Sequence, residues 1–197
     1  MAQLKMVYLK EFGCPDEFPI PEGFSFVPFT MELAPQYYQL RIDGGFTSPW
    51  DDEAFKKYEP KLTPNGLILV KHIESGRLVA AASAEKRILP LDPPFDASLG
   101  WVIAHPDFRG KKLGKLVCTT VTRKLIVEGY AKLVLSTDDF RIPAIATYLN
   151  IGWLPWLYEP DMQERWQNVL KTLNRTNVKP VELPPNNPWE NYPTTIF

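Results

Sequence analysis

Hydrophobic and polar residues change their spacing along the chain, and this spacing predicts the secondary structure. Up to residue 105, most apolar runs are short and alternate with polar residues, which is typical of strands. Two segments have helical spacing instead. We expect strands over residues 4–12, 24–29, 66–74, 77–89 and 98–105, and helices over residues 30–40 and 49–58.

Local signals mark the ends of several of these elements. Thr30 is expected to cap the first helix, and the acidic residues 51–53 suit the positive end of the second helix dipole. The dipeptide at residues 75–76, Ser-Gly, is compatible with a tight hairpin between two strands. The first half of the sequence therefore predicts the strands of a sheet, with two helices between the second and third strands along the chain.

The pattern changes beyond residue 105, where helices and strands alternate. Apolar residues share one face of a helix that starts near Leu113, and Gly129 stands at its C-terminal end. A strand over residues 131–136 follows, then a helix with Pro143 in its first turn and Gly152 just beyond its end. A strand over 153–158 and a helix over 161–173 complete the pattern. This alternation implies crossovers and some parallel pairing, so the fold class is mixed α/β.

Composition and charge exclude several classes of protein. The 197 residues carry 22 Lys and Arg against 23 Asp and Glu, and a formal charge of −1 gives no broad positive field for nucleic acid. The longest apolar stretch is far shorter than the ~20 residues of a membrane span. Residues 1–13 lack a signal-peptide core, so we expect a cytoplasmic protein that uses no membrane. Two cysteines and two histidines offer no metal-ligand spacing, so no metal is expected.

The chain has room for one domain, which we place at residues 1–176. The tail at residues 177–197 is rich in proline and contains Trp189, Tyr192 and Phe197. A segment with these aromatic residues is too apolar for a free linker. We expect the tail to pack back on the domain or on a second subunit of a homodimer.

A basic loop enters the helix near Leu113 and suits an anion. Its cations and glycines are Arg109, Gly110, Lys111, Lys112, Gly114 and Lys115. The first N–H groups of a helix have no intrahelical partner, and the dipole is positive there. The glycines enclose three residues rather than the four of a Walker loop, and no Gly-x-Gly-x-x-Gly occurs. The alternative is a surface helix start whose lysines only solubilise it.

Two motifs resemble one family. Residues 109–114 look like the pyrophosphate loop, Arg/Gln-x-x-Gly-x-Gly/Ala, of the GNAT superfamily of acyl-CoA-dependent N-acyltransferases. Residues 135–153 are similar to its second motif, a strand followed by Asn-x-x-Ala-x-x-x-Tyr-x-x-x-Gly-Phe. Ala144, Tyr148 and Gly152 match in register, whereas Arg141 replaces Asn and Trp153 replaces Phe. The resemblance, which covers residues 99–153, implies a mostly antiparallel central sheet with splayed parallel strands, flanked by helices.

The resemblance also implies a binding mode for acetyl-CoA as cosubstrate. The cosubstrate would lie where the strand over 98–105 splays from the strand over 131–136. The amide of Val102 would face the thioester carbonyl, Ala104 would pair with the pantetheine, and residues 109–115 would hold the pyrophosphate. Lys112 stands where the family usually has glycine, so its side chain must find space beside the phosphates.

The same resemblance assigns the general acid and leaves the base open. Tyr148 matches the family's acid, and a phenol with a pKa near ~10 can protonate a departing thiolate. Carboxylates are uncommon on a central strand unless they are paired or used, so Glu85 is our preferred base. A water chain could replace any candidate; the side chains considered are Glu85, Asp96, Asp138, Asp139 and His105.

The predicted reaction is transfer of an acetyl group to a primary amine of a small molecule or peptide by direct attack. A rival interpretation is a CoA-binding regulatory or scaffold domain that has lost turnover. Aromatic residues of the N-terminal helices and final strands could line the acceptor pocket, although core packing is their commoner role. These residues are Tyr37, Tyr38, Phe46, Trp50, Trp153, Trp156 and Tyr158.

Overall fold

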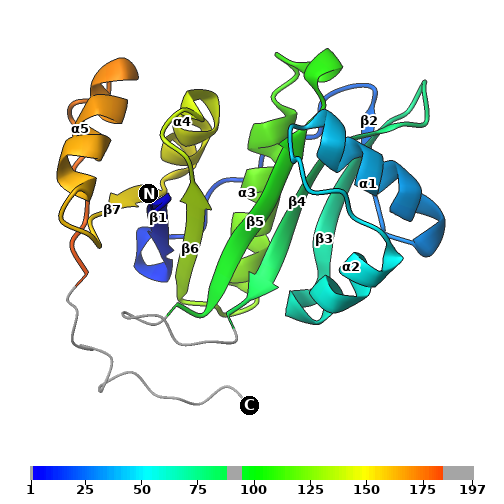
Figure 1. The fold of residues 1–197 in the computed structure, drawn as a ribbon, viewed down its shortest axis with the longest axis horizontal. Helices are drawn as coiled ribbons and strands as arrows, with labels where there is room; N and C mark the ends of the chain where they lie inside the picture. The colour runs from blue at the N-terminus through cyan, green and yellow to red at the C-terminus, as the bar shows by residue number, and fades with distance from the viewer. Residues whose placement is uncertain (1, 88–94, 184–197) are drawn as a thin grey trace.

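The structure, a computed structural model, describes residues 2–87 and 95–183 and contains a seven-stranded sheet with helices on both faces (Figure 1). The strands are β1 (Leu4–Leu9), β2 (Phe24–Val27), β3 (Leu62–His72), β4 (Leu78–Lys86), β5 (Ala97–Ala104), β6 (Lys132–Thr137) and β7 (Leu154–Trp156). The α-helices are α1 (Ala34–Asp43), α2 (Asp52–Tyr58), α3 (Leu113–Val127), α4 (Ile142–Ile151) and α5 (Met162–Thr172). The order across the sheet is β2-β3-β4-β5-β6-β1-β7.

The predicted fold class is confirmed, because all the paired strands are antiparallel except β5 and β6. That parallel pairing covers only two residue pairs, Ala97 with Leu133 and Ser98 with Val134. Beyond Ser98 the two strands diverge, as Figure 1 shows. The sheet therefore opens at its middle, between two strands that separate toward their C-terminal ends.

One apolar cluster covers one face of the sheet, and two separate clusters cover the other face. Helix α3 packs on one face with small residues of β4 such as Ala80 and Ala82, which allow close approach of the helix. On the other face, α1 and α2 bury Tyr37 and Phe55 over β3 and β4. A separate cluster around Trp156 covers β6, β1 and β7 on that second face. The two clusters on the second face leave the β5–β6 opening between them.

Most element ends agree with the sequence, but Lys10–Phe12, expected as part of a strand, form a 3-10 turn, and β3 begins at Leu62 rather than at residue 66. Asp51 caps α2 by accepting a hydrogen bond from the Ala54 N–H at 2.8 Å. Gly129 and Gly152 have left-handed backbones, with φ of +98° and +107°, just beyond α3 and α4. Thr30 was expected to cap a helix, but its side chain makes no capping bond. A 3-10 turn over Met31–Leu33 intervenes, and α1 begins only at Ala34, with Pro35 in its first turn.

The described part of the C-terminal tail lies against β7. Val181 bridges to Trp156, its N–H donates to the Pro155 carbonyl, and its own carbonyl accepts from Leu157. The tail residues Trp189, Tyr192 and Phe197 lie outside the described residues. None of the described helices has both the length and the apolar character needed to span a membrane. Cys14 and Cys118 are both free.

Candidate active site

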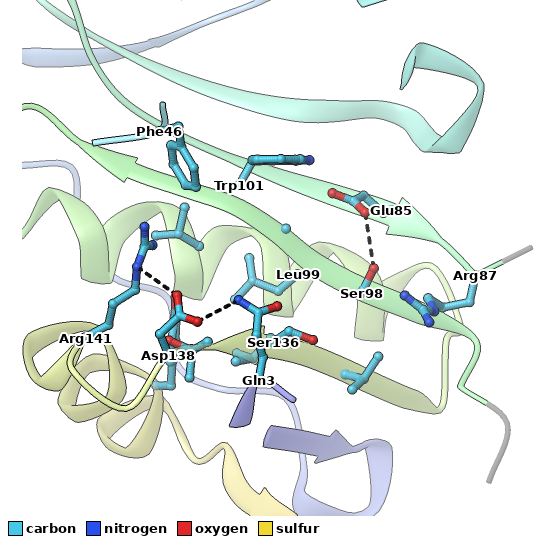
Figure 2. Close-up of a pocket in the computed structure, with 16 residues that line it drawn as sticks. Gln3, Phe46, Glu85, Arg87, Ser98, Leu99, Trp101, Ser136, Asp138 and Arg141 are labelled. Carbon is cyan, nitrogen blue, oxygen red and sulfur yellow. Dashed lines mark hydrogen bonds and ion pairs between the residues drawn. The ribbon is translucent and has the colours of Figure 1, made fainter. Parts of the chain in front are cut away.

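A groove of about 300 Å³ opens where β5 and β6 diverge (Figure 2). Residues 98–102 of β5 and 134–137 of β6 line it, together with Asp138 just beyond β6. Glu85 enters from β4, Tyr148 from α4, and Phe46 from the loop after α1. The divergence of the strands therefore gathers side chains from four elements that are far apart in the sequence.

Tyr148 lines this groove from the helix α4, as the sequence predicts. Its side chain is otherwise buried in the core that α3 forms with the sheet. Burial raises the pKa of Tyr148 well above its ordinary value of 10, because the phenolate would lose hydration. The phenol is therefore protonated at neutral pH and is able to donate a proton into the groove.

Glu85 also lines the groove, with its two carboxylate oxygens in different surroundings. Oε1 accepts hydrogen bonds from the Tyr58 hydroxyl at 2.8 Å and the Ser83 hydroxyl at 2.7 Å. Oε2 has only a long contact of 3.5 Å with the Ser98 hydroxyl. One oxygen is thus fixed by two neutral donors, while the other has room for a further donor.

Gly100 makes this position of Glu85 possible. A Cβ built on Gly100 would lie 1.8 Å from Oε1 of Glu85 and 2.8 Å from the Ser83 hydroxyl oxygen. Glycine lets the carboxylate lie directly against the backbone of β5. Any other residue would displace the carboxylate or the strand.

Two of the other candidate bases have structural roles away from the groove. Asp96 accepts hydrogen bonds from the N–H groups of Ala131 and Lys132, at 2.9 and 3.0 Å. His105 shapes the turn after β5, where its Nδ1 accepts from the Asp107 N–H at 3.2 Å. Neither residue lines the groove.

The last two candidate bases, Asp138 and Asp139, precede α4, but no side chain caps that helix. Asp138 lines the groove, accepts from Gln3 at 3.0 Å and lies 3.7 Å from the Arg141 guanidinium (Figure 2). Asp139 instead makes a two-point ion pair with Arg165 of α5, which lowers the pKa of Asp139. Among the five candidates, Glu85 and Asp138 line the groove.

The strand β5 is distorted where it lines the groove. The register with β4 shifts between Ala81 and Ser83, so Trp101 and Val102 bulge out of the regular pairing. Trp101 has a φ of +43°, a strained value for a bulky residue. Val102 lines the groove at this bulge, whereas Ala104 has rejoined the ladder opposite Ala80. The bulge thus directs backbone groups away from β4, beside the opening.

An aromatic cage around Arg41 supports the strained Trp101. The Arg41 guanidinium carbon lies 3.6 Å from the Trp50 ring centroid and 4.0 Å from that of Trp101. Arg41 is fully buried, and its nitrogens make no hydrogen bond of good geometry within the described chain. Burial lowers the pKa of Arg41, which the nearby Tyr37 hydroxyl partly offsets. Stacking on the two indoles is thus the main stabilisation of this cation.

The basic loop after β5 fits an anion. Gly110 has a φ of +80° and Lys112 a φ of +60°, so Lys112 occupies a left-handed position that favours glycine. Among the described hydrogen bonds, the backbone N–H groups of residues 112–115 have no protein acceptor. A Cβ on Gly114 would meet no atom within 4 Å outside the backbone of its own helix. Free amides, open space and the cationic side chains of Arg109, Lys111 and Lys115 are what a diphosphate requires.

Comparison with known proteins identifies the family. Residues 30–153, more than half of the chain, match the model of the acetyltransferase (GNAT) family. The chain belongs to this family. The resemblance noted in the sequence is therefore confirmed, and this GNAT chain contains an acyltransferase domain.

Other relatives of this GNAT protein agree with the assignment. An uncharacterized N-acetyltransferase of Schizosaccharomyces pombe is 28% identical over 137 residues, which cover 67% of this chain and 80% of the relative. A GCN5-related N-acetyltransferase from Sphaerobacter thermophilus has a TM-score of 0.61 at 15% identity over 79% of this chain. A tandem GNAT protein from the clavulanic acid biosynthesis pathway has a TM-score of 0.61 at 18% identity over 78% of this chain. The chain spans about half the length of these two structures, 49% and 50%, and the likeness to them concerns the fold.

Several groove residues of the GNAT chain were not predicted from the sequence. Gly100, Trp101 and Arg87 line the groove but carry no motif, and the same holds for Arg41, which stacks on Trp101. A signal was present for Arg87: residues 83, 85 and 87 alternate as Ser, Glu and Arg along one strand, which places them on one face. Nothing in the sequence indicates that Trp101 lies at a bulge or that Arg41 is buried.

Proposed function

We propose that this protein transfers an acetyl group from acetyl-CoA to the primary amine of a small molecule or peptide. Glu85 acts as the general base and Tyr148 as the general acid. The observation that carries the proposal is that both side chains reach one groove of about 300 Å³ from separate elements, β4 and α4. A base and an acid at one opening are what direct attack on a thioester requires.

Each residue has a defined part in the reaction. Oε2 of Glu85 accepts the proton that the amine loses as the new C–N bond forms. The N–H of Val102 donates to the carbonyl oxygen, on which negative charge develops. Tyr148 gives its proton to the sulfur as the C–S bond breaks, so that one proton leaves the amine and one reaches the thiol. Solvent then restores both side chains.

The loop over residues 109–115 would bind the diphosphate of acetyl-CoA. Support comes from its unpartnered N–H groups, its four cationic side chains and the open space at Gly114. Lys112 already has a left-handed backbone, as glycine would have at this position. Its N–H is therefore available to the diphosphate, and only its side chain must turn away from the phosphates. Bound here, acetyl-CoA supplies the activated acyl group, and Ala104 lies on the path from the loop to the groove.

Two linked measurements test the proposal. Acetyl-CoA should raise the melting temperature of the wild type by linkage, and Gly114→Trp should abolish that rise by filling the space at the helix start. A free-thiol assay with a panel of amines, amino acids and peptides should detect amine-dependent release of CoA. A thermal shift without thiol release for any amine would favour the rival scaffold function, and no shift at millimolar acetyl-CoA would contradict both functions.

A further inference from the structure

Two carboxylates of described residues line the groove, and among these residues only Asp138 has a cation as ion-pair partner. Asp138 lies beside the Arg141 guanidinium and accepts a hydrogen bond from the side-chain amide of Gln3. Glu85 is held by neutral hydroxyl groups alone, and no ion pair between described residues includes it. The uncompensated carboxylate suits the amine of an acceptor, which is cationic in solution.

A charge of opposite sign, which also has no ion-pair partner in the described part of the chain, lies further along the same face. Arg87 follows Glu85 by two residues, and side chains at that spacing on a strand share a face. Figure 2 shows the Arg87 side chain turned over the groove toward Ser98. Among the described ion pairs none involves Arg87. A cation thus lines the groove roughly 7 Å along the strand from the Glu85 position.

Lys5 is a second cation, on β1, which lies beside the residues that line the groove. It pairs in register with Ser136, which lines the groove, and its ammonium lies 4.1 Å from the Tyr158 ring centroid. The pKa of Lys5 is lowered by burial and then by the charge of Arg87, which Glu159 partly offsets. Arg87 lines the groove from the end of β4 and Lys5 lies beside it on β1, and the positive charge of each disfavours the other. An anion placed between two such cations relieves that repulsion.

We propose that the acceptor is a small amine that also carries an anionic group, a carboxylate or a phosphate. Its amine lies at Glu85 and its anion lies between Arg87 and Lys5. The inference rests on the proposed function and specifies its substrate class. The spacing along β4 favours acceptors in which the two groups are a few bonds apart.

The far end of the groove disfavours acceptors with a second positive charge. Arg141 lies there, 5.0 Å from the Phe46 ring centroid, and the buried Arg41 lies 5.3 Å from the same ring. Asp138 offsets the charge of Arg141, so the pair offers a second ammonium no free carboxylate, and a diamine with one nitrogen at Glu85 would direct the other toward Arg87 and Lys5. Repulsion in a partly desolvated groove makes such an acceptor poor.

Matched acceptors that differ only in charge test this inference by thiol release. The pairs are 4-aminobutanoate with butylamine and aminoethyl phosphate with aminoethanol, and 1,3-diaminopropane serves as the dication. We expect kcat/KM for the anionic member of at least one pair to exceed that of its neutral match by about tenfold or more. The pair with the larger ratio of kcat/KM shows whether the anionic group is a carboxylate or a phosphate. Equal or faster turnover of every neutral amine, or of the diamine, overturns the inference and leaves acyl transfer intact. No thiol release with any amine contradicts the proposed function instead.

Charge reversal tests the assignment of Arg87. Arg87→Glu should lower kcat/KM for the anionic acceptor by about tenfold or more and leave the neutral match within about twofold. Lys86→Glu is the control, because it makes the same change of charge one residue away, and Lys86 lines a different pocket. KM for acetyl-CoA should be unchanged in both variants. Equal losses in the two variants would show a general field effect and overturn the assignment.

Discussion

The α-carbon of Gly100 lies so close to the Glu85 carboxylate that a Cβ on it would fall 1.8 Å from Oε1. The same oxygen accepts hydrogen bonds from Tyr58 and Ser83. Three elements, α2, β4 and β5, therefore determine where the carboxylate lies. Gly100 acts as a positioning residue in this arrangement, because it makes room for Glu85 without contacting a substrate.

Gly100→Ala should lower kcat and leave KM for acetyl-CoA nearly unchanged. The added methyl group displaces Glu85 from its two hydroxyl donors, whereas the basic loop is unaffected. Steady-state thiol release measures both constants. The loss should approach that of Glu85→Gln, for which about 10²-fold or more is expected if a general base is removed.

The double variant separates positioning from a general loss of structure. If Gly100 acts only through Glu85, the variant that combines Gly100→Ala with Glu85→Gln should have the kcat of Glu85→Gln alone. Multiplied losses in the double variant would show that Gly100 has a separate role. Urea denaturation of each variant controls for unfolding.

Lys112 and Lys111 form a matched pair for the anion loop. Lys112 has a left-handed backbone with φ of +60°, whereas Lys111 has no positive φ. Lys112→Gly removes the strain of a side chain at that position, while Lys111→Gly only adds freedom to the unfolded chain. We expect the free energy of unfolding of Lys112→Gly to exceed that of Lys111→Gly by about 1 kcal/mol in urea denaturation. A more stable Lys111→Gly would show that the backbone at residue 112 is unstrained.

The sequence predicts the elements that surround the groove better than the packing of the side chains within and beside it. Spacing and caps predict most of the elements, and the two motifs predict the family, the basic loop and the position of Tyr148. Alternation on β4 also places Glu85 on a sheet face. The bulge at Trp101 depends on pairing with a strand about 20 residues away, so local patterns do not contain it. The burial of Arg41 depends on rings from α1, its following loop and β5, which only the folded chain brings together.

The pH dependence follows from the raised pKa of Tyr148. A proton donor whose pKa lies above 10 remains protonated throughout the range in which an alkylamine with a pKa near ~10.4 becomes neutral. kcat/KM for the amine should therefore rise from pH 7 toward pH 10 with no descending limb. Because the folded-state pKa is raised, the stability that this neutral phenol contributes is present below pH ~10 and is lost above it. A descending limb with a midpoint below pH ~9, in protein shown to be folded, would contradict the assignment.

The most direct test of acid catalysis in the groove is amine-dependent thiol release by Tyr148→Phe compared with the wild type. This variant keeps the ring that packs in the core and removes only the hydroxyl. We predict that kcat falls about 10- to 1000-fold, while KM for acetyl-CoA and the acetyl-CoA thermal shift change little. Turnover equal to that of the wild type would remove Tyr148 from the mechanism and contradict the account.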